Sequence, residues 1–326
     1  MIDSANPASK QRIDVHHHLC PPQYAADVGK IIPLFKPLLE WSPERSIEDM
    51  DLGGVETAIL SMSTPGVWFG DAGATRRLAR ECNDYMARLR ADHPGRFGIF
   101  ATLPMPDIDG SLREIEYALD TLRADGICLM TSYGTKYLGE AEFFPVLDEL
   151  NRRGAVVYTH PTVSPCCVNL APVVSEAIIE YGTDTTRTIA SLIFSGTAAR
   201  LPNTRFIFSH AGGTMPFLIG RFLQQQRNKP DITKLAGGLM PEIKRYFYDT
   251  AQSCNPVTMS ALNRLVGPSR ILFGTDFPWG RAAAHVEGLR ECDFSAAELD
   301  MVFGDNARAL LSGCSPSCTA AHAHGH

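Results

Sequence analysis

The chain has 326 residues, of which 44% are hydrophobic and 20% are charged, and its formal net charge is -6 at pH 7. The charges are interspersed without a basic patch, which argues against a nucleic-acid partner. No apolar run is long enough to span a membrane, and the first residues lack the apolar core of a signal peptide. Nine scattered cysteines are typical of reduced thiols and predict a cytoplasmic protein rather than a disulfide framework.

Strand-like and helix-like segments alternate along most of the chain. Residues 1–11 are predicted to be a flexible N-terminus, and a Pro-rich stretch at about 19–45 is predicted to be an irregular loop insertion. Apolar periodicity and stop signals predict helices over 46–52, 73–92, 110–124, 141–153, 185–200 and 258–266. Eight strands are expected between them, over 13–18, 55–60, 97–103, 126–130, 155–160, 205–210, 246–250 and 270–274.

Eight such repeats predict an α/β protein with one (β/α)8 TIM barrel as its catalytic domain, over residues 12–312. A doubly wound sheet is the alternative, but no Gly-rich phosphate motif follows the first strand. The tail at 313–326 is small and polar, holds cysteines and histidines, and is predicted to be disordered. In a TIM barrel the functional groups lie at the C-terminal ends of the strands, so these ends indicate where to look for a site.

The first strand ends in the consecutive histidines His16, His17 and His18. Side chains alternate faces along a strand, so His16 and His18 would share one face while His17 lies on the other. Two imidazoles at this spacing can bind one metal ion. A polar strand end is the simpler alternative. An expression tag does not fit a run that is flanked by Ile-Asp-Val and Leu-Cys-Pro-Pro.

Further polar residues occupy the same kind of position in the predicted barrel. His160 and His210 end the fifth and sixth predicted strands, and Asp276 follows the eighth. Each of them alone is explained as a strand-end or turn residue. Their joint position favours a catalytic metal centre, because three histidines and one carboxylate leave coordination positions open for water and substrate. Cys166 and Cys167 could offer a thiolate, but the ligand set is already complete without them.

Four motifs occur in a characteristic order: Ile-Asp-Val-His-His-His-Leu-Cys-Pro-Pro from residue 13, Val-Tyr-Thr-His-Pro from 157, Phe-Ser-His-Ala-Gly-Gly-Thr-Met-Pro-Phe from 208, and Phe-Gly-Thr-Asp-Phe-Pro from 273. In this order they resemble the amidohydrolase superfamily, on the branch typified by aminocarboxymuconate-semialdehyde decarboxylase. The resemblance implies that His16, His18, His160 and Asp276 hold one divalent metal ion and that His210 acts in acid–base chemistry. It favours Zn²⁺, with Mn²⁺ as the alternative, because relatives that use manganese replace the first histidine by Glu.

The resemblance also implies a contact between subunits. Arg221 lies eleven positions beyond His210, where the family has an arginine that enters the neighbouring subunit's site and binds a carboxylate. The planar guanidinium suits a carboxylate through two parallel hydrogen bonds. The protein is therefore expected to be a homodimer or a larger homo-oligomer. An ordinary surface arginine is the alternative reading of Arg221.

The expected reaction is the non-oxidative decarboxylation of a small aromatic or unsaturated carboxylic acid that carries oxygen substituents. The segments 131–139 and 166–170 resemble relatives that act on salicylate-like acids such as 6-methylsalicylate. A metal ion stabilises developing charge, and a positioned acid, His210 or Asp276, protonates the carbon that loses CO2. Trp279 is predicted to form an apolar wall against a flat ring, with a core aromatic as an equal alternative.

Two other functions use the same fold. A metal-dependent hydrolase of an amide, ester or lactone could employ the same residues, since the metal also activates water. A non-catalytic scaffold is disfavoured because every expected ligand and His210 are present. The offset of Arg221 and the Ser-His-Ala-Gly-Gly motif favour the lyase over the hydrolase.

Overall fold

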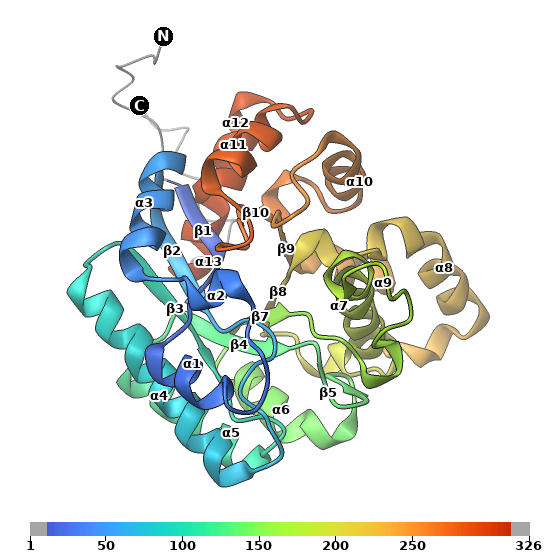
Figure 1. The fold of residues 1–326 in the computed structure, drawn as a ribbon. Coiled ribbons are helices and arrows are strands. Elements are labelled where there is room, and N and C mark those ends of the chain that lie inside the picture. Colours follow the sequence, from blue (N-terminus) through green and yellow to red (C-terminus); the bar gives the residue numbers. More distant parts are fainter. Residues whose placement is uncertain (1–11, 314–326) are drawn as a thin grey trace, which may run out of the picture.

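The computed structural model describes residues 12–313, and its centre is a closed sheet of parallel strands (Figure 1). The strands follow one another around the sheet in the order β1 (Arg12–His18), β2 (Val55–Ser61), β3 (Phe97–Thr102), β4 (Gly126–Met130), β7 (Val156–His160), β8 (Arg205–Phe208), β9 (Phe247–Asp249) and β10 (Ile271–Leu272). The sheet closes because the main-chain N–H of Val15 donates to the carbonyl of Phe273 (3.0 Å) and that of Asp276 to the carbonyl of His16 (2.8 Å). The predicted (β/α)8 barrel is confirmed.

The helices surround the barrel (Figure 1). They are α1 (Pro22–Val28), α2 (Lys36–Leu39), α3 (Pro43–Gly53), α4 (Ala72–Asp92), α5 (Ile108–Glu116), α6 (Phe144–Arg152), α7 (Glu176–Phe194), α8 (Met215–Asn228), α9 (Leu239–Arg245), α10 (Pro256–Val266), α11 (Ala282–Arg290), α12 (Ala296–Asp300) and α13 (Asn306–Leu311). A short antiparallel pair, β5 (Ser132–Tyr133) and β6 (Lys136–Tyr137), follows β4. No helix among residues 12–313 combines the length and the apolar character that a membrane crossing requires.

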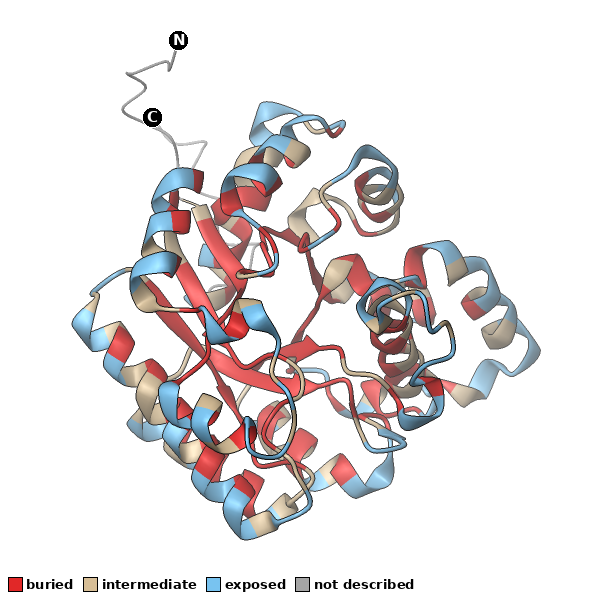
Figure 2. Ribbon diagram, in the orientation of Figure 1, coloured by how far each residue is buried: buried red, intermediate tan, exposed pale blue. Residues whose placement is uncertain are grey.

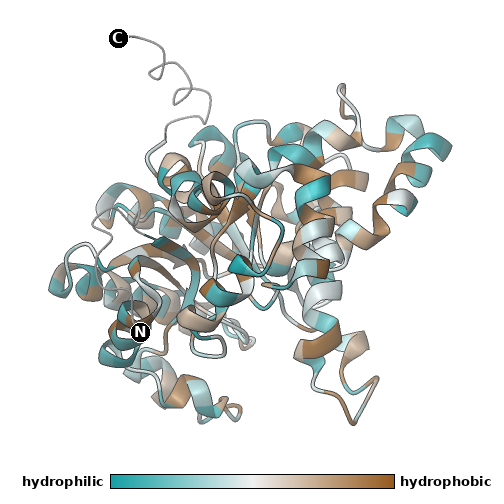
Figure 3. Cartoon of the chain, turned by 90° about the horizontal axis from the view of Figure 1, so that it is seen from above, coloured by the Kyte–Doolittle hydropathy of each residue, from teal (hydrophilic) through white to brown (hydrophobic). Residues whose placement is uncertain are grey.

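The apolar core has two layers, because each strand buries both of its faces. Figure 2 shows the strands buried and the outer faces of the helices exposed, and Figure 3 shows the matching division between hydrophobic and hydrophilic residues. Inward side chains such as Val15, Phe100 and Tyr158 fill the barrel below its mouth. Outward side chains such as Leu60 and Phe208 pack against the helices. The filled interior leaves the mouth, at the C-terminal strand ends, as the place for a site.

Two predicted segments differ from the structure. The stretch at 19–45, expected to be irregular, contains α1 and α2, each with a proline in its first turn, where proline is favoured. Helix α7 begins at Glu176, nine residues before the predicted start at Thr185. Its threonines lower helix propensity, and tertiary packing overrides that preference. The predicted flexible N-terminus (1–11) and residues 314–326 of the predicted tail lie outside the described residues.

Candidate metal centre and active site

A cluster of potential metal ligands lies at the mouth of the barrel. His16 and His18 come from the end of β1, His160 from the end of β7, and Asp276 from the loop after β10. One ligand atom from each of these residues lies within 4.8 Å of those of the others. No other group of three or more such residues is found among residues 12–313. The structure thus brings together the four residues that the motifs single out.

Each histidine of the cluster is oriented by an oxygen atom that accepts from its Nδ1. The pairs are His16 with Asp249 Oδ2 (2.8 Å), His18 with the carbonyl of Ser61 (3.1 Å) and His160 with the carbonyl of Pro161 (2.9 Å). These oxygens only accept, so Nδ1 carries the proton and Nε2 presents a lone pair. The Nε2 atoms of His16 and His18 lie 2.9 Å apart. Lone pairs that converge in this way fit a metal ion between them.

Asp276 connects the cluster to His210. Its Oδ1 lies 3.2 Å from Nε2 of both His16 and His18, while its Oδ2 lies 3.5 Å from Nε2 of His210. Both Asp276 (φ 62°) and His210 (φ 53°) have the left-handed backbone conformation that is uncommon for non-glycine residues and that clusters at functional sites. One carboxylate therefore serves the ligand cluster with one oxygen and the acid–base candidate with the other.

The charges of the cluster favour a cation. Burial alone would lower the pKa of His16, but Asp249 and Asp276 raise it to about 10. Burial alone would raise the pKa of Asp276, but His16 and the hydrogen bonds from the histidines hold it well below its usual range. Burial lowers the pKa of His18 and of His160, so these two rings stay neutral. A divalent metal requires deprotonated donors, so a metal ion held here would displace the proton that the two carboxylates favour on His16.

His210 is held by its backbone, and its ring nitrogen Nδ1 is buried without a partner among the described residues. The main-chain N–H of His210 donates to Asp249 Oδ1 (2.8 Å). The turn that carries it packs against α7, since a Cβ at Gly213 would lie 1.9 Å from the carbonyl oxygen of Gly182. The Gly-Gly of the motif is required for this close approach. Strand β8 ends at Phe208, so His210 begins a turn rather than ending the strand as predicted.

Asp249 is a site residue that the sequence did not single out. It is fully buried at the end of β9, and its two carboxylate oxygens contact His16 Nδ1 and the His210 N–H. The sequence could have identified it, because Asp249 is an acidic residue near the C-terminal end of a predicted barrel strand. The other site residues were selected by the same kind of position.

The remaining predicted residues lie around the cluster or away from it. Trp279 has 37% of its surface exposed, and its ring lies 5.7 Å from that of His18, at the edge of the mouth. Arg221 is exposed on α8, and within this one subunit it does not join the metal cluster. Cys166 and Cys167 lie next to each other, with their sulfur atoms 3.4 Å apart, and they are also outside the cluster.

The sequence is similar to those of known proteins over most of its length. Residues 13–313 match the amidohydrolase family, and the chain belongs to that family. A 6-methylsalicylic acid decarboxylase from Penicillium expansum is 39% identical over 293 residues, which cover 88% of this chain and 90% of that protein. A 2-amino-3-carboxymuconate-6-semialdehyde decarboxylase from Dictyostelium discoideum is 27% identical over 280 residues, covering 83% and 77%. These relatives confirm the branch that the four motifs predict: the chain is a carboxy-lyase of the amidohydrolase superfamily.

A solved structure shows the same fold. It is that of a dihydroxybenzoic acid decarboxylase from Polaromonas sp., crystallised with bound manganese and the inhibitor 2-nitroresorcinol. The TM-score is 0.80 at 24% sequence identity, and the match covers 93% of this chain and 97% of the other.

Proposed function

We propose that the enzyme decarboxylates a salicylate-type acid, that is, an aromatic acid with a hydroxyl group beside the carboxylate. The observation that carries the proposal is the Asp276 carboxylate, which faces His16 and His18 with one oxygen and His210 with the other. His210, the proposed proton donor, then lies next to the residues that are proposed to hold the metal ion. The 6-methylsalicylic acid decarboxylase that is 39% identical to this chain supports the choice of substrate class.

The metal is proposed to be one divalent ion held by His16, His18, His160 and Asp276. When bound, it would stabilise the negative charge that develops on the oxygen substituents of the substrate. Zinc is favoured over manganese because three imidazoles and one carboxylate form a nitrogen-rich set, and imidazole suits zinc while carboxylate and water suit manganese. The manganese in the Polaromonas enzyme keeps Mn²⁺ as the alternative.

The proton transfer is assigned to the pair of His210 and Asp276. As the bond to CO2 breaks, its electron pair stays on the ring carbon, and that carbon takes up a proton. His210 Nε2 and Asp276 Oδ2 lie 3.5 Å apart, so a proton can pass from one to the other before it reaches the ring. Asp249 accepts from the His210 main chain and keeps this residue at the cluster. Trp279, beside His18, is proposed to cover one face of the ring.

The test is turnover of salicylate and 6-methylsalicylate by metal-loaded protein in deuterated water. The expected result is release of CO2 and deuterium at the carbon that carried the carboxylate, with no oxygen or organic cofactor added. Assays of lactone, ester and amide hydrolysis run in parallel. Hydrolysis of these substrates without CO2 release from any acid would replace the lyase by the hydrolase.

The working unit is proposed to be at least a homodimer. Arg221 is exposed on α8, and large apolar side chains are exposed nearby on α8, on α7 and in the segment before α7. They are Val168, Leu170, Val173, Ile178, Ile179 and Phe217, with exposed fractions from 49% to 96%, and we call them the apolar patch. The two helices touch where Thr214 N–H donates to the carbonyl of Gly182 (3.4 Å). Clustered exposed apolar residues indicate a protein interface, and a second copy would bring Arg221 toward a site.

Mixing two impaired variants, assayed at a concentration of acid that does not saturate Arg221→Ala, tests this arrangement. Arg221→Ala should keep the metal and lose affinity for the acid by about 10-fold or more, because a charge-assisted hydrogen bond is lost. Subunits with Arg221→Ala mixed with subunits carrying His210→Asn should regain activity, because one site of the hybrid dimer holds both intact residues. A hybrid dimer that forms but stays inactive would contradict the assignment of Arg221, and full activity as a dilute monomer would contradict the dimer.

A cytoplasmic location is also proposed. The cysteines among residues 12–313 are all free, and this supports a reducing compartment.

A further inference from the structure

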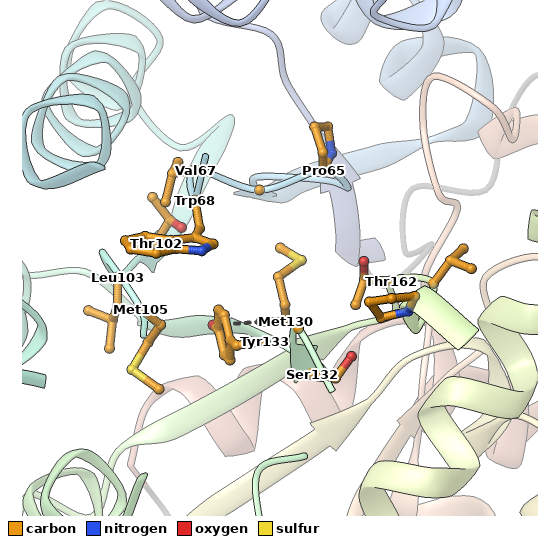
Figure 4. Close-up of a pocket in the computed structure, with 14 residues that line it drawn as sticks. Pro65, Val67, Trp68, Thr102, Leu103, Met105, Met130, Ser132, Tyr133 and Thr162 are labelled. Atoms are coloured by element: carbon orange, nitrogen blue, oxygen red, sulfur yellow. Dashed lines mark hydrogen bonds between the residues drawn. The ribbon is translucent and has the colours of Figure 1, made fainter. Parts of the chain in front are cut away.

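A cavity of about 170 Å³ lies at the mouth of the barrel, on the side of β2, β3 and β4. Its lining combines apolar and sulfur-containing side chains with hydroxyl groups, and Figure 4 shows Trp68, Met105, Met130 and Tyr133 around it. Thr102 and Thr162 are two of the hydroxyl-bearing residues in this lining. None of the four proposed metal ligands lines this cavity, and neither do His210 and Trp279.

The cavity adjoins the metal centre through the backbone. Met130, at the end of β4, is the register partner of His160 on β7, and the next residue, Thr131, donates its N–H to the His160 carbonyl (2.9 Å). Thr162 lies two residues beyond His160. The loop after β2 closes the other side, since the Thr64 hydroxyl donates to the carbonyl of Pro161 (2.8 Å). A ligand at the metal centre would therefore have this cavity beside it.

Size and chemistry describe the guest. An apolar cavity of about 150 Å³ in another protein binds benzene, so this volume suits one six-membered ring or the substituted edge of one. Thr102 is only 3% exposed, and it lines the cavity. Its main-chain N–H and carbonyl are both bound by the Asn83 amide at 2.9 Å, which fixes the residue in place. A hydroxyl group in the lining of an otherwise largely apolar cavity can form a hydrogen bond with a polar substituent of a ligand.

We propose that this cavity is the subsite for the side of the ring that faces away from the hydroxyl group beside the carboxylate, and that it accepts a small alkyl substituent and one polar ring substituent. The inference rests on the proposed function for the position of the carboxylate. Met130 and Met105 would contact the alkyl group, since thioether side chains adapt to irregular apolar surfaces. The Thr102 hydroxyl would bind the polar substituent. The enzyme would thus prefer alkylated salicylates to salicylate itself.

Binding of the decarboxylated products tests the subsite without turnover. Loss of CO2 from salicylate leaves phenol, and loss from 6-methylsalicylate leaves 3-methylphenol. Metal-loaded protein should bind 3-methylphenol about fourfold more tightly than phenol, which is the value of one buried methyl group. Tryptophan fluorescence should report binding through Trp68. The response should be smaller in Trp68→Phe, where Trp279 is the one tryptophan left beside the ring, and unchanged in Trp41→Phe, whose tryptophan does not line this cavity.

Two substitutions change the subsite without touching the metal ligands. Thr102→Val should weaken binding of a resorcinol, which has a second ring hydroxyl, by about tenfold while leaving 3-methylphenol unaffected. Its control is Thr204→Val, a buried threonine located before β8 at the opposite end of the barrel, outside the cavity lining. Met130→Ala should raise kcat/KM for 6-propylsalicylate relative to 6-methylsalicylate by about tenfold. Met259→Ala, a buried methionine on α10, is its control.

The outcomes separate the two proposals. Equal affinity for phenol and 3-methylphenol, with ligand preferences unchanged in Thr102→Val and Met130→Ala at normal metal content, overturns the subsite. If the phenols bind as described but no acid releases CO2, the subsite stands and the proposed reaction fails. If a variant loses metal or folds poorly, the fluorescence of the wild-type protein with the two phenols still decides the case.

Discussion

The two halves of the barrel mouth carry different kinds of side chain. At the ends of β1, β7, β9 and β10 the side chains are histidines and aspartates, each fixed by at least one partner. At the ends of β3 and β4 they are Thr102 and Met130, and both line the cavity. Buried charged groups are tolerated only with partners, so the first half is rigidly connected. The second half has a threonine hydroxyl and the flexible thioethers of Met105 and Met130.

If both proposals hold, chemistry and substrate choice depend on side chains from separate strands. A change on the charged half should alter the metal content or the rate of every substrate. A change on the cavity half should alter the choice among substrates and leave the metal in place. Substitutions on the charged half and at its edge test this division.

The largest effect is expected from loss of a metal ligand. His160→Ala should lose tightly bound metal and reduce kcat/KM by about 10³-fold or more, because several kcal/mol of charge stabilisation are removed. Metal analysis and CO2 release measure the result, on protein truncated before Gly313 so that the Cys- and His-containing tail does not contribute metal. The control is His285→Ala, a buried histidine of α11 outside the cluster. Unchanged metal stoichiometry and activity in His160→Ala would remove this residue from the site.

Loss of the acid–base group is expected to be next. His210→Asn should keep the metal and lower kcat by about 10²–10⁴-fold. Asparagine is chosen because it tolerates the positive φ of 53° at this position better than alanine does. Single-turnover CO2 release, together with the metal content, separates chemistry from folding. A rate near that of the wild type would exclude His210 from proton transfer.

Asp249 should have an intermediate effect, since it positions two site residues rather than contacting substrate. Asp249→Asn should weaken metal affinity or lower activity by about 10–100-fold. Competition with a chelator measures the metal affinity. Asp125→Asn is the matched control, because Asp125 also accepts a main-chain N–H, that of Ile99 (2.8 Å), but precedes β4 at the far end of the barrel. If both variants behave alike, Asp249 has only a structural role.

The smallest effect is expected at Trp279, which borders the charged half. Trp279→Ala should raise KM by a few-fold, about the value of one aromatic contact, while Trp279→Phe should retain most of the affinity. Steady-state kinetics with salicylate and 6-methylsalicylate measure both. Because Trp279 does not line the cavity, the loss should be equal for the two acids. A loss of affinity confined to the methylated acid would show instead that Trp279 contacts the methyl group of the substrate.

The alternation of strands and helices, and the positions of most candidate site residues, could be predicted from the sequence alone. His16, His18, His160 and Asp276 could be selected because the C-terminal ends of barrel strands converge whatever their distance along the chain. The first two histidines were also related by the two-residue period of a strand, which depends only on local geometry. Patterns of this kind depend only on residues that are close together in the sequence.

The groups that complete the site could be identified only from the tertiary structure. Asp249 is 233 positions from the histidine that it orients, and no local pattern connects the two residues. The start of α7 was missed because packing, and not propensity, extends that helix. The cavity arises where β3, β4 and the loops after β2 and β7 leave space between them. A void is a property of how side chains from distant segments fit together, and sequence periodicity carries no information about it.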